Sequence, residues 1–326
     1  MHKYMNITIV MYHYVRDLKH SRYPEIKGLD IFHFKEQIYY LKKHYNFITM
    51  EMLIDSIDNK SLLPPKSVLL TFDDAYSDHF NYVFPFLNNQ NIQGSFFTPV
   101  KAITEHVVLD VNKIHFILAK EENKSKIIKE IKYELNKYRN DYNLKSDLFY
   151  FQKYAESSRY DSADVMFIKN LLQFGLEESL RKIIANNLFE KIIGINEESF
   201  SRELYMDIEQ IECMNRNGMH IGAHGYDHYW LGSLTLENQK KEIEKSIDFL
   251  NQIQSDINNW TMCYPYGNYN ESTIELLMNY NCKLALTTEV NIVDLKANNK
   301  YKLPRLDTND LPKNREMTTN DWYFKG

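Results

Sequence analysis

Cysteine is scarce in this chain, and its scarcity excludes two kinds of site. The 326 residues include only three cysteines, Cys213, Cys263 and Cys282. The odd number, the wide spacing and the lack of a CxxC pair argue against a disulfide framework and against a thiolate zinc site. We therefore expect reduced thiols, as in a cytosolic protein.

Long hydrophobic runs are also missing. No stretch approaches the ~18 consecutive apolar residues of a transmembrane helix, so none is predicted. The apolar run at Ile7–Met11 is too short for the hydrophobic region of a secretion signal, and no small-residue cleavage site follows it. We expect a cytoplasmic protein, whose membrane association, if any, would come through a biosynthetic complex.

The chain has no excess of positive charge either. Its net charge is −5, and no basic stripe with interleaved aromatic residues is present, which argues against a nucleic-acid partner. With 44% hydrophobic and 25% charged residues, the composition is typical of one large domain or of one domain carrying an insertion. The sequence gives no indication of the oligomeric state.

What the sequence does contain is an alternation of strands and helices. Short apolar runs predict strands at residues 7–11, 68–72, 94–98, 219–223, 260–264, 284–287 and 301–303. Helical spacing of apolar residues predicts helices at 34–45, 50–57 and 82–89, a helix capped by Asp207 with Gln210, and a long helix capped by Thr235. Strands that alternate with helices predict an α/β fold with a parallel sheet, closed or open.

Residues 103–205 break this rhythm. The segment is rich in Lys, Glu, Asn and Tyr and has only helical patterns. We therefore predict a discontinuous core of residues 1–102 and 206–326 with a helical insertion at 103–205. The insertion would serve as a lid, a substrate platform or an oligomer contact, or it is a plain structural elaboration.

Two carboxylates follow a predicted strand in Thr71-Phe72-Asp73-Asp74. Sites in α/β folds lie at this edge of the sheet. Paired carboxylates repel, which raises one pKa unless a cation lies between them. A metal bound by one Asp would leave the other as a base. The alternative is that the pair only caps a turn or helix.

Two histidines, His224 and His228, follow the predicted strand at 219–223. Their spacing of four residues is typical of two-His metal motifs. Two His and one Asp make a plausible zinc set with open positions for water and substrate, and another divalent first-row metal would also fit. Alternatively, each His has only a structural role.

Three more groups lie at predicted strand ends. The turn Tyr264-Pro265-Tyr266-Gly267 could aim a backbone N–H at the site and stabilise an oxyanion. His13 ends the first strand, and Arg305 follows the last one, where it could orient a carboxylate by bidentate bonding. The alternatives are a simple turn, a hydrogen-bonded buried His and a surface Arg.

At these residues the chain resembles the polysaccharide deacetylases, also known as NodB-homology proteins or carbohydrate esterase family 4. The family motif TFDDG corresponds to Thr71–Ala75, H(S/T)xxH to His224–His228, and a motif close to RPPYG to Cys263–Gly267. The order of the motifs is similar to that of a circularly permuted branch that includes poly-N-acetylglucosamine deacetylases. The resemblance covers about residues 5–102 and 205–308 and leaves the insertion unexplained.

The resemblance implies a distorted (β/α)7 barrel and a division of labour among the site residues. Asp73 would be the general base, and a divalent metal, usually Zn²⁺ but also Ni²⁺, Co²⁺ or Mn²⁺, would be held by Asp74, His224 and His228. The backbone N–H of Tyr266 would stabilise the oxyanion.

The chain departs from the family pattern at three positions. The usual late catalytic His is absent, and the resemblance to the permuted branch points to His13 as the acid. Cys263 stands in place of the motif-three Arg, and Arg305 would supply the missing cation near Asp73. Ala75 stands in place of a Gly, which would adopt a positive φ more easily.

The expected function is therefore metal-dependent N-deacetylation of an acetylated amino sugar, with release of acetate. The substrate would be a glycan, a lipid-linked sugar or a nucleotide-sugar intermediate. Two alternatives stay open: a metal-dependent hydrolase of another amide or of an O-acetyl ester, and a non-catalytic carbohydrate-binding barrel.

Overall fold

The computed structural model describes residues 6–326 and divides the chain into two compact units. The first contains Gly28–His106, Arg202–Gly326 and the described residues up to Asp17, and the second contains Leu18–Lys27 and Val107–Ser201. The sequence predicts an insertion at 103–205. The second unit of the structure also includes the short segment 18–27, for which the sequence gives no signal.

The first unit is built on a mainly parallel sheet, which confirms the α/β class. Its strands follow the order β10-β1-β5-β6-β7-β8-β9, with β11 paired to β1 and β4 to β5. Their bounds are β1 Asn6–Tyr12, β4 Asn46–Phe47, β5 Ser67–Asp73, β6 Gly94–Thr98, β7 His220–Ala223, β8 Met262–Cys263, β9 Ala285–Leu286, β10 Val293–Asp294 and β11 Leu306–Asp307. Among the described strands of this sheet, β10 alone runs antiparallel to its neighbour, β1.

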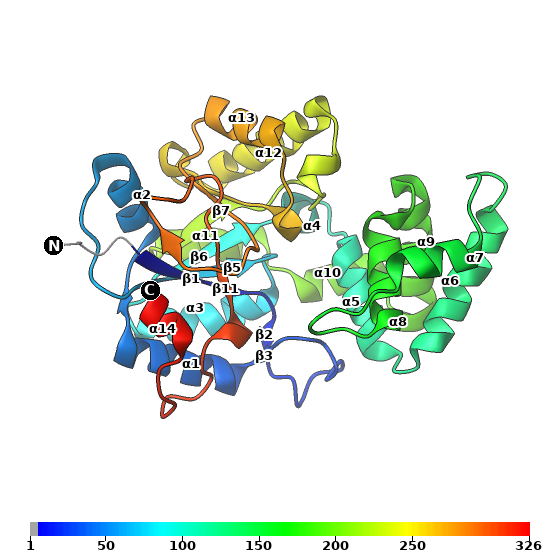
Figure 1. The fold of residues 1–326 in the computed structure, drawn as a ribbon, viewed down its shortest axis with the longest axis horizontal. Helices are drawn as coiled ribbons and strands as arrows, with labels where there is room; N and C mark the ends of the chain where they lie inside the picture. Colours follow the sequence, from blue (N-terminus) through cyan, green and yellow to red (C-terminus); the bar gives the residue numbers. More distant parts are fainter. Residues whose placement is uncertain (1–5) are drawn as a thin grey trace. The chain divides into compact units, whose positions relative to one another are not determined.

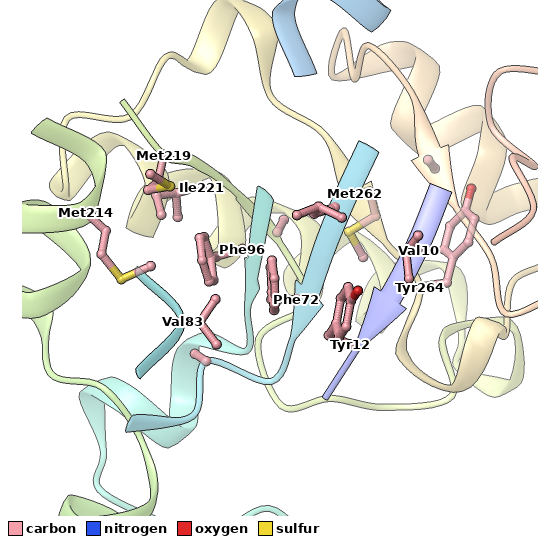
Figure 2. Close-up of a cluster of buried hydrophobic side chains, with 14 of the residues drawn as sticks. Val10, Tyr12, Phe72, Val83, Phe96, Met214, Met219, Ile221, Met262 and Tyr264 are labelled. Atoms are coloured by element: carbon pink, nitrogen blue, oxygen red, sulfur yellow. The ribbon is translucent and has the colours of Figure 1, made fainter. Parts of the chain in front are cut away.

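The pairing register of β1, β5 and β6 places a row of aromatic rings across the centre of this sheet. Tyr12, Phe72 and Phe96 are directly paired on β1, β5 and β6. Their rings stack with centroids 4.9 Å apart for Tyr12–Phe72 and 4.8 Å apart for Phe72–Phe96. Figure 2 shows the three rings side by side within the buried core. Because Phe72 fills this face, the next residue of β5 directs its side chain to the other face.

The last predicted strand is shorter than expected. Within 301–303 only Leu303 pairs, in an isolated parallel bridge with Leu286 of β9, and the chain then continues into β11 beside β1. The hydrogen-bonded order ends at β10 and β9, so residues 6–326 contain no continuous closed sheet.

Helices flank the strands of the first unit (Figure 1). They are α1 Ile31–His44, α2 Met50–Asn59, α3 Phe84–Asn89, α4 Val100–Thr104, α11 Ile208–Arg216, α12 Leu236–Gln252, α13 Glu271–Asn279 and α14 Asp321–Lys325. The predicted caps are confirmed: Asp207 and Gln210 form a capping box, and Thr235 accepts from the backbone of Asn238. The helix expected at 82–89 is instead a π-helix at His79–Val83 followed by α3.

Short connections complete this unit. Four 3₁₀ turns lie at Leu231–Ser233, Ile257–Asn259, Pro265–Gly267 and Thr308–Asp310. The strands β2 Val15–Arg16 and β3 Leu29–Asp30 form a separate two-stranded sheet. They flank the segment 18–27 on both sides and thereby tie its two ends together.

The second unit is helical. Its helices are α5 Asp110–Lys120, α6 Lys124–Tyr138, α7 Asp147–Tyr154, α8 Ala163–Asn170, a π-helix at Leu171–Gly175, α9 Glu178–Ile193 and most of α10 Glu197–Leu204. Ile117, Phe167 and Leu180 are fully buried in it. Tyr23 joins the segment 18–27 to this unit through ring contacts with Phe116 and Phe200. Among residues 6–326, no helix is long and apolar enough to cross a membrane.

Candidate active site

The two carboxylates at the end of β5 reach one site because the chain turns sharply there. Asp73 is the last residue of β5. Asp74 and Ala75 have φ values of +75° and +54°, in the left-handed region that costs a residue with a Cβ atom about 1–2 kcal/mol. At Ala75 a Gly would avoid this cost, so the departure from the family motif falls on a strained position.

Asp74, His224 and His228 converge on one point. The Oδ1 atom of Asp74 lies 3.4 Å from Nε2 of His224 and 3.3 Å from Nε2 of His228. The three ligand atoms lie within 4.8 Å of one another, and all three side chains are buried. Two imidazoles and one carboxylate are a donor set that zinc and other divalent first-row metals accept.

Hydrogen bonding on the far side of His224 determines which nitrogen faces the site. Nδ1 of His224 lies 2.7 Å from the carbonyl oxygen of Cys263, an acceptor, so Nδ1 carries the hydrogen. In the neutral ring, Nε2 therefore directs a lone pair at Asp74 Oδ1. That buried oxygen has no hydrogen-bond partner among the described residues. Acceptors that face one another in a buried position are stabilised by a cation between them, so these residues fit a metal.

The charges of the site point the same way. Burial acts to raise the pKa of Asp74, but the neighbouring imidazoles outweigh it and hold the pKa well below its usual range. Burial acts to lower the pKa of His224, but Cys263, Asp74 and Asp73 outweigh it and raise the pKa well above its usual value. At His228, by contrast, burial outweighs Asp74 and lowers the pKa. The two carboxylates therefore favour positive charge at His224 but not at His228.

The loop between the two histidines is held by backbone contacts on two sides. Gly225 and Tyr226 accept hydrogen bonds from the backbone of Val100 and Lys101, at the start of α4. On the other side, the Glu242 carboxylate of α12 accepts from the backbone N–H groups of Tyr226 and Asp227, at 2.8 and 2.9 Å. These contacts fix the positions of both histidines.

Asp73 is paired with Arg305. Nη1 and Nη2 of Arg305 lie 3.0 and 2.8 Å from the two carboxylate oxygens of Asp73. Cys263 Sγ lies 3.4 Å from Asp73 and accepts a bond from Arg305 at 3.0 Å. Burial acts to raise the pKa of Asp73, but the charges of Arg305 and His224 outweigh it and lower the pKa to about 2.

His13 and Tyr266 lie at the edge of the same site. Nε2 of His13 is 3.8 Å from Asp73 Oδ2, and its side chain is 41% exposed. Tyr266 has a φ of +57°, and its ring centroid lies 4.8 Å from that of His228. The structure therefore brings all seven residues singled out in the sequence into one region of the first unit.

Two residues at the site escaped the sequence analysis. The Tyr76 hydroxyl donates a 2.7 Å hydrogen bond to Asp74 Oδ2, and its position two residues after Asp74 was the only available signal. Glu242 is one of many glutamates on a helix with a polar face, and no sequence pattern distinguishes it. Tyr76 thus contacts a candidate metal ligand directly, whereas Glu242 contacts the loop between the other two.

Comparison with known proteins gives a family match. The family model for polysaccharide deacetylase matches residues 60–285. No curated protein sequence matched the chain significantly.

Solved structures share the fold along nearly the whole chain. The deacetylase PplD of Streptococcus pyogenes, solved in complex with acetate, is 17% identical, with a TM-score of 0.56 over 94% of this chain and 93% of that one. The deacetylase domain of BpsB from Bordetella bronchiseptica is 14% identical, with a TM-score of 0.55 over 93% and 96%. IcaB from Ammonifex degensii is 18% identical, with a TM-score of 0.51 over 99% and 96%.

Proposed function

Because the chain belongs to the polysaccharide deacetylase family, we propose that it is a metal-dependent N-deacetylase of an acetylated amino sugar. The observation that carries this proposal is the convergence of Asp74, His224 and His228 beside a second buried carboxylate, Asp73. One carboxylate is engaged by imidazoles and the other by a guanidinium. The two adjacent acids are thus equipped for different tasks.

We propose a divalent metal, most readily Zn²⁺ and otherwise Ni²⁺, Co²⁺ or Mn²⁺, held by Asp74, His224 and His228. When bound, such an ion polarises a carbonyl group and lowers the pKa of water. The chain supplies the orientation of its ligands: Cys263 O fixes the His224 ring, and Tyr76 holds the distal oxygen of Asp74.

Asp73 is the proposed general base. The carboxylate is ionised at neutral pH, which is the form that can accept a proton from water as the water oxygen attacks the acetyl carbon. Arg305 holds both carboxylate oxygens and thereby fixes the direction from which Asp73 approaches. The proton taken up by Asp73 returns to solvent after the reaction.

The remaining roles concern the oxyanion and the leaving group. We assign the backbone N–H of Tyr266 as a donor to the carbonyl oxygen as its negative charge develops. His13, protonated, gives its proton to the amide nitrogen as the C–N bond breaks. Its partial exposure and its position 3.8 Å from Asp73 support this role. The products are acetate and a free amino sugar.

We further propose that the strands of the first unit form a distorted seven-stranded barrel. The isolated bridge from Leu286 to Leu303 and the pairing of β11 with β1 support closure through residues 303–307. One buried cluster also unites side chains from β1, β5, β6, β8, β9 and the bridge residue Leu303, including Ile9, Leu69, Phe97, Cys263, Leu286 and Leu303. An inward-facing core of this kind is typical of closed sheets.

The experiment is an acetate-release assay with purified protein, Zn²⁺ and a panel of N-acetylated and O-acetylated sugars. We expect release from an N-acetylated amino sugar. Replacing the proposed base, Asp73→Asn, should lower kcat about 10²- to 10⁴-fold without loss of bound metal. Asp58→Asn is the matched control, because Asp58 only pairs with Lys283 at the surface. Near-normal kcat in D73N would sink the scheme, and release from O-acetyl esters alone would replace amide with ester hydrolysis.

A further inference from the structure

The helical second unit contains a cavity of its own. Its volume is about 530 Å³, within the range of small-molecule sites. Three regions of the sequence line it: the segment 18–27, α5 with the start of α6, and α8 with the loop before it. None of the site residues described above belongs to it.

One part of the cavity wall carries more positive than negative charge. Asp161 lies between two lysines, with Lys27 Nζ 2.5 Å from Oδ1 and Lys169 Nζ 2.8 Å from Oδ2. Lys27 also donates to the carbonyl oxygen of Tyr160, at 2.6 Å. An ammonium group has three N–H donors, so after these bonds both lysines can still donate to a ligand.

Another part of the wall offers acceptors. The carboxylates of Glu25 and Glu122 line the cavity and accept no hydrogen bond from any described residue. The nearby Lys124 ammonium is engaged by the carbonyl oxygens of Leu118 and Glu121, at 2.6 and 2.7 Å. The two glutamates therefore keep their hydrogen-bonding capacity for a ligand.

The rest of the lining is aromatic or apolar. The side chain of Tyr160 is 51% exposed, and Leu118, Ala119 and Val165 contribute apolar surface. Donors, acceptors, an exposed ring and apolar patches together suit a sugar ring, whose hydroxyls donate and accept while its C–H face packs on an aromatic side chain. Lys124 lies near Glu25 and Glu122 and interacts with both through charge, but no hydrogen bond from a described residue occupies either carboxylate, so their acceptor positions suit a ligand that carries an ammonium group.

We propose that this cavity binds a saccharide unit of a polymeric substrate, and that it prefers a unit with a free amino group. The proposal rests on the proposed function, because N-deacetylation is what creates that group. A second binding site on the same chain raises the effective concentration of a polymer at the first site but does nothing for a monomer. The substrate class is accordingly a polymer that is already partly deacetylated.

The test uses the full chain and four probes: N-acetylglucosamine, its hexasaccharide, a partly deacetylated hexasaccharide, and the fully deacetylated hexasaccharide. Binding is measured by calorimetry in the D73N background, in which the expected loss of kcat makes turnover slow during the titration. We expect Tyr160→Ala and Glu122→Gln each to weaken binding of the deacetylated hexasaccharide by about 10-fold, the loss typical of one important contact. Tyr133→Ala is the matched control, because Tyr133 is 65% exposed on α6 of the same unit and does not line the cavity.

Kinetics with Asp73 intact give the second readout. Both cavity variants should lower kcat/KM for a partly deacetylated hexasaccharide and leave that for the monomer unchanged. Equal binding and equal kinetics in Y160A, E122Q and Y133A would overturn the proposal, as would stronger binding of the fully acetylated hexasaccharide. Failure of the proposed function has a different signature: the wild-type chain would release no acetate from any probe, while calorimetry would still report on the cavity.

Discussion

Arg305 and Asp73 form a fully buried, two-pronged ion pair between residues 232 positions apart in the chain. The planar guanidinium matches the carboxylate, and such bidentate pairs fix orientation as well as charge. Arg305 also donates to Thr71 Oγ1 and to the carbonyl oxygen of Thr287. The proposed base is therefore held by a residue that directly precedes β11, near the end of the chain.

Removing the Arg305 guanidinium should lower the free energy of unfolding. Arg305→Leu leaves Asp73 buried without its partner, and breaking a buried pair costs about 3–5 kcal/mol. Arg305→Lys keeps the charge but loses the two-pronged geometry, so its loss should be smaller. Urea denaturation at neutral pH measures both. A loss below about 1 kcal/mol in R305L would contradict the importance of the pair.

Glu242 should make the stability of the chain depend on pH. Burial raises the pKa of its carboxyl group to about 7, against the opposing effect of its two backbone hydrogen bonds. The folded pKa lies above the unfolded one, so the folded state binds the extra proton, and stability falls as pH rises from about 4.5 to about 7. Glu242→Gln keeps an acceptor for the two N–H groups and does not titrate.

We therefore expect the variant E242Q to gain stability over the wild type above pH 7, by up to about 3 kcal/mol, and to lose this advantage below pH 5. Thermal unfolding across this pH range, with the metal content held constant, measures the difference. A pH-independent difference between the two proteins would refute the assignment.

Tyr76 should matter for metal affinity. Tyr76→Phe removes the hydroxyl that donates to Asp74 Oδ2 and leaves the ring in place. Loss of such a supporting hydrogen bond weakens metal binding about 10- to 100-fold. Competition with a chromogenic chelator measures the change. Tyr12→Phe is the control, because its hydroxyl bonds Gln37 in the core; equal affinities in Y76F and Y12F would exclude the role.

Metal removal should abolish activity and lower the melting temperature. A ligand present at 100 times its Kd stabilises the folded state by about 2.7 kcal/mol. Adding Zn²⁺ to protein from which a chelator has removed the metal should raise the melting temperature. This rise should persist in D73N and disappear in His228→Ala. Scanning fluorimetry with Zn²⁺, Co²⁺, Ni²⁺ and Mn²⁺ in turn would also rank the metals. A full Zn²⁺ shift in H228A would exclude His228 as a ligand.

Much of the fold could be predicted because its signals are local. The strand expected at 94–98 has those bounds in the structure, and the caps at Asp207 and Thr235 were readable from short polar patterns. The end of the sheet was harder to place. Near Leu303 the strand pairing consists of a single bridge to Leu286. The order of the strands in the sequence does not determine whether the sheet closes there.

The candidate site was only partly predictable for a related reason. Strand ends gather at one edge, so a sequence can nominate Asp73, Asp74, His224 and His228 together. It cannot supply contacts between helices and loops, such as the one from Glu242 to the loop at Tyr226. Nor could it assign the segment 18–27 to the helical unit, since that packing depends on Tyr23 meeting rings more than 90 positions away.

The late position of Arg305 has a consequence for how the protein is made. A ribosome delivers Asp73 early and its counter-charge only after residue 304 has been added. Until Arg305 is available, burying Asp73 in the partly formed sheet would leave its negative charge without a partner. This cost opposes folding of the first unit before the chain is nearly complete. Folding of the first unit is thereby coupled to near-completion of synthesis, and fragments that end before Arg305 should be readily degraded.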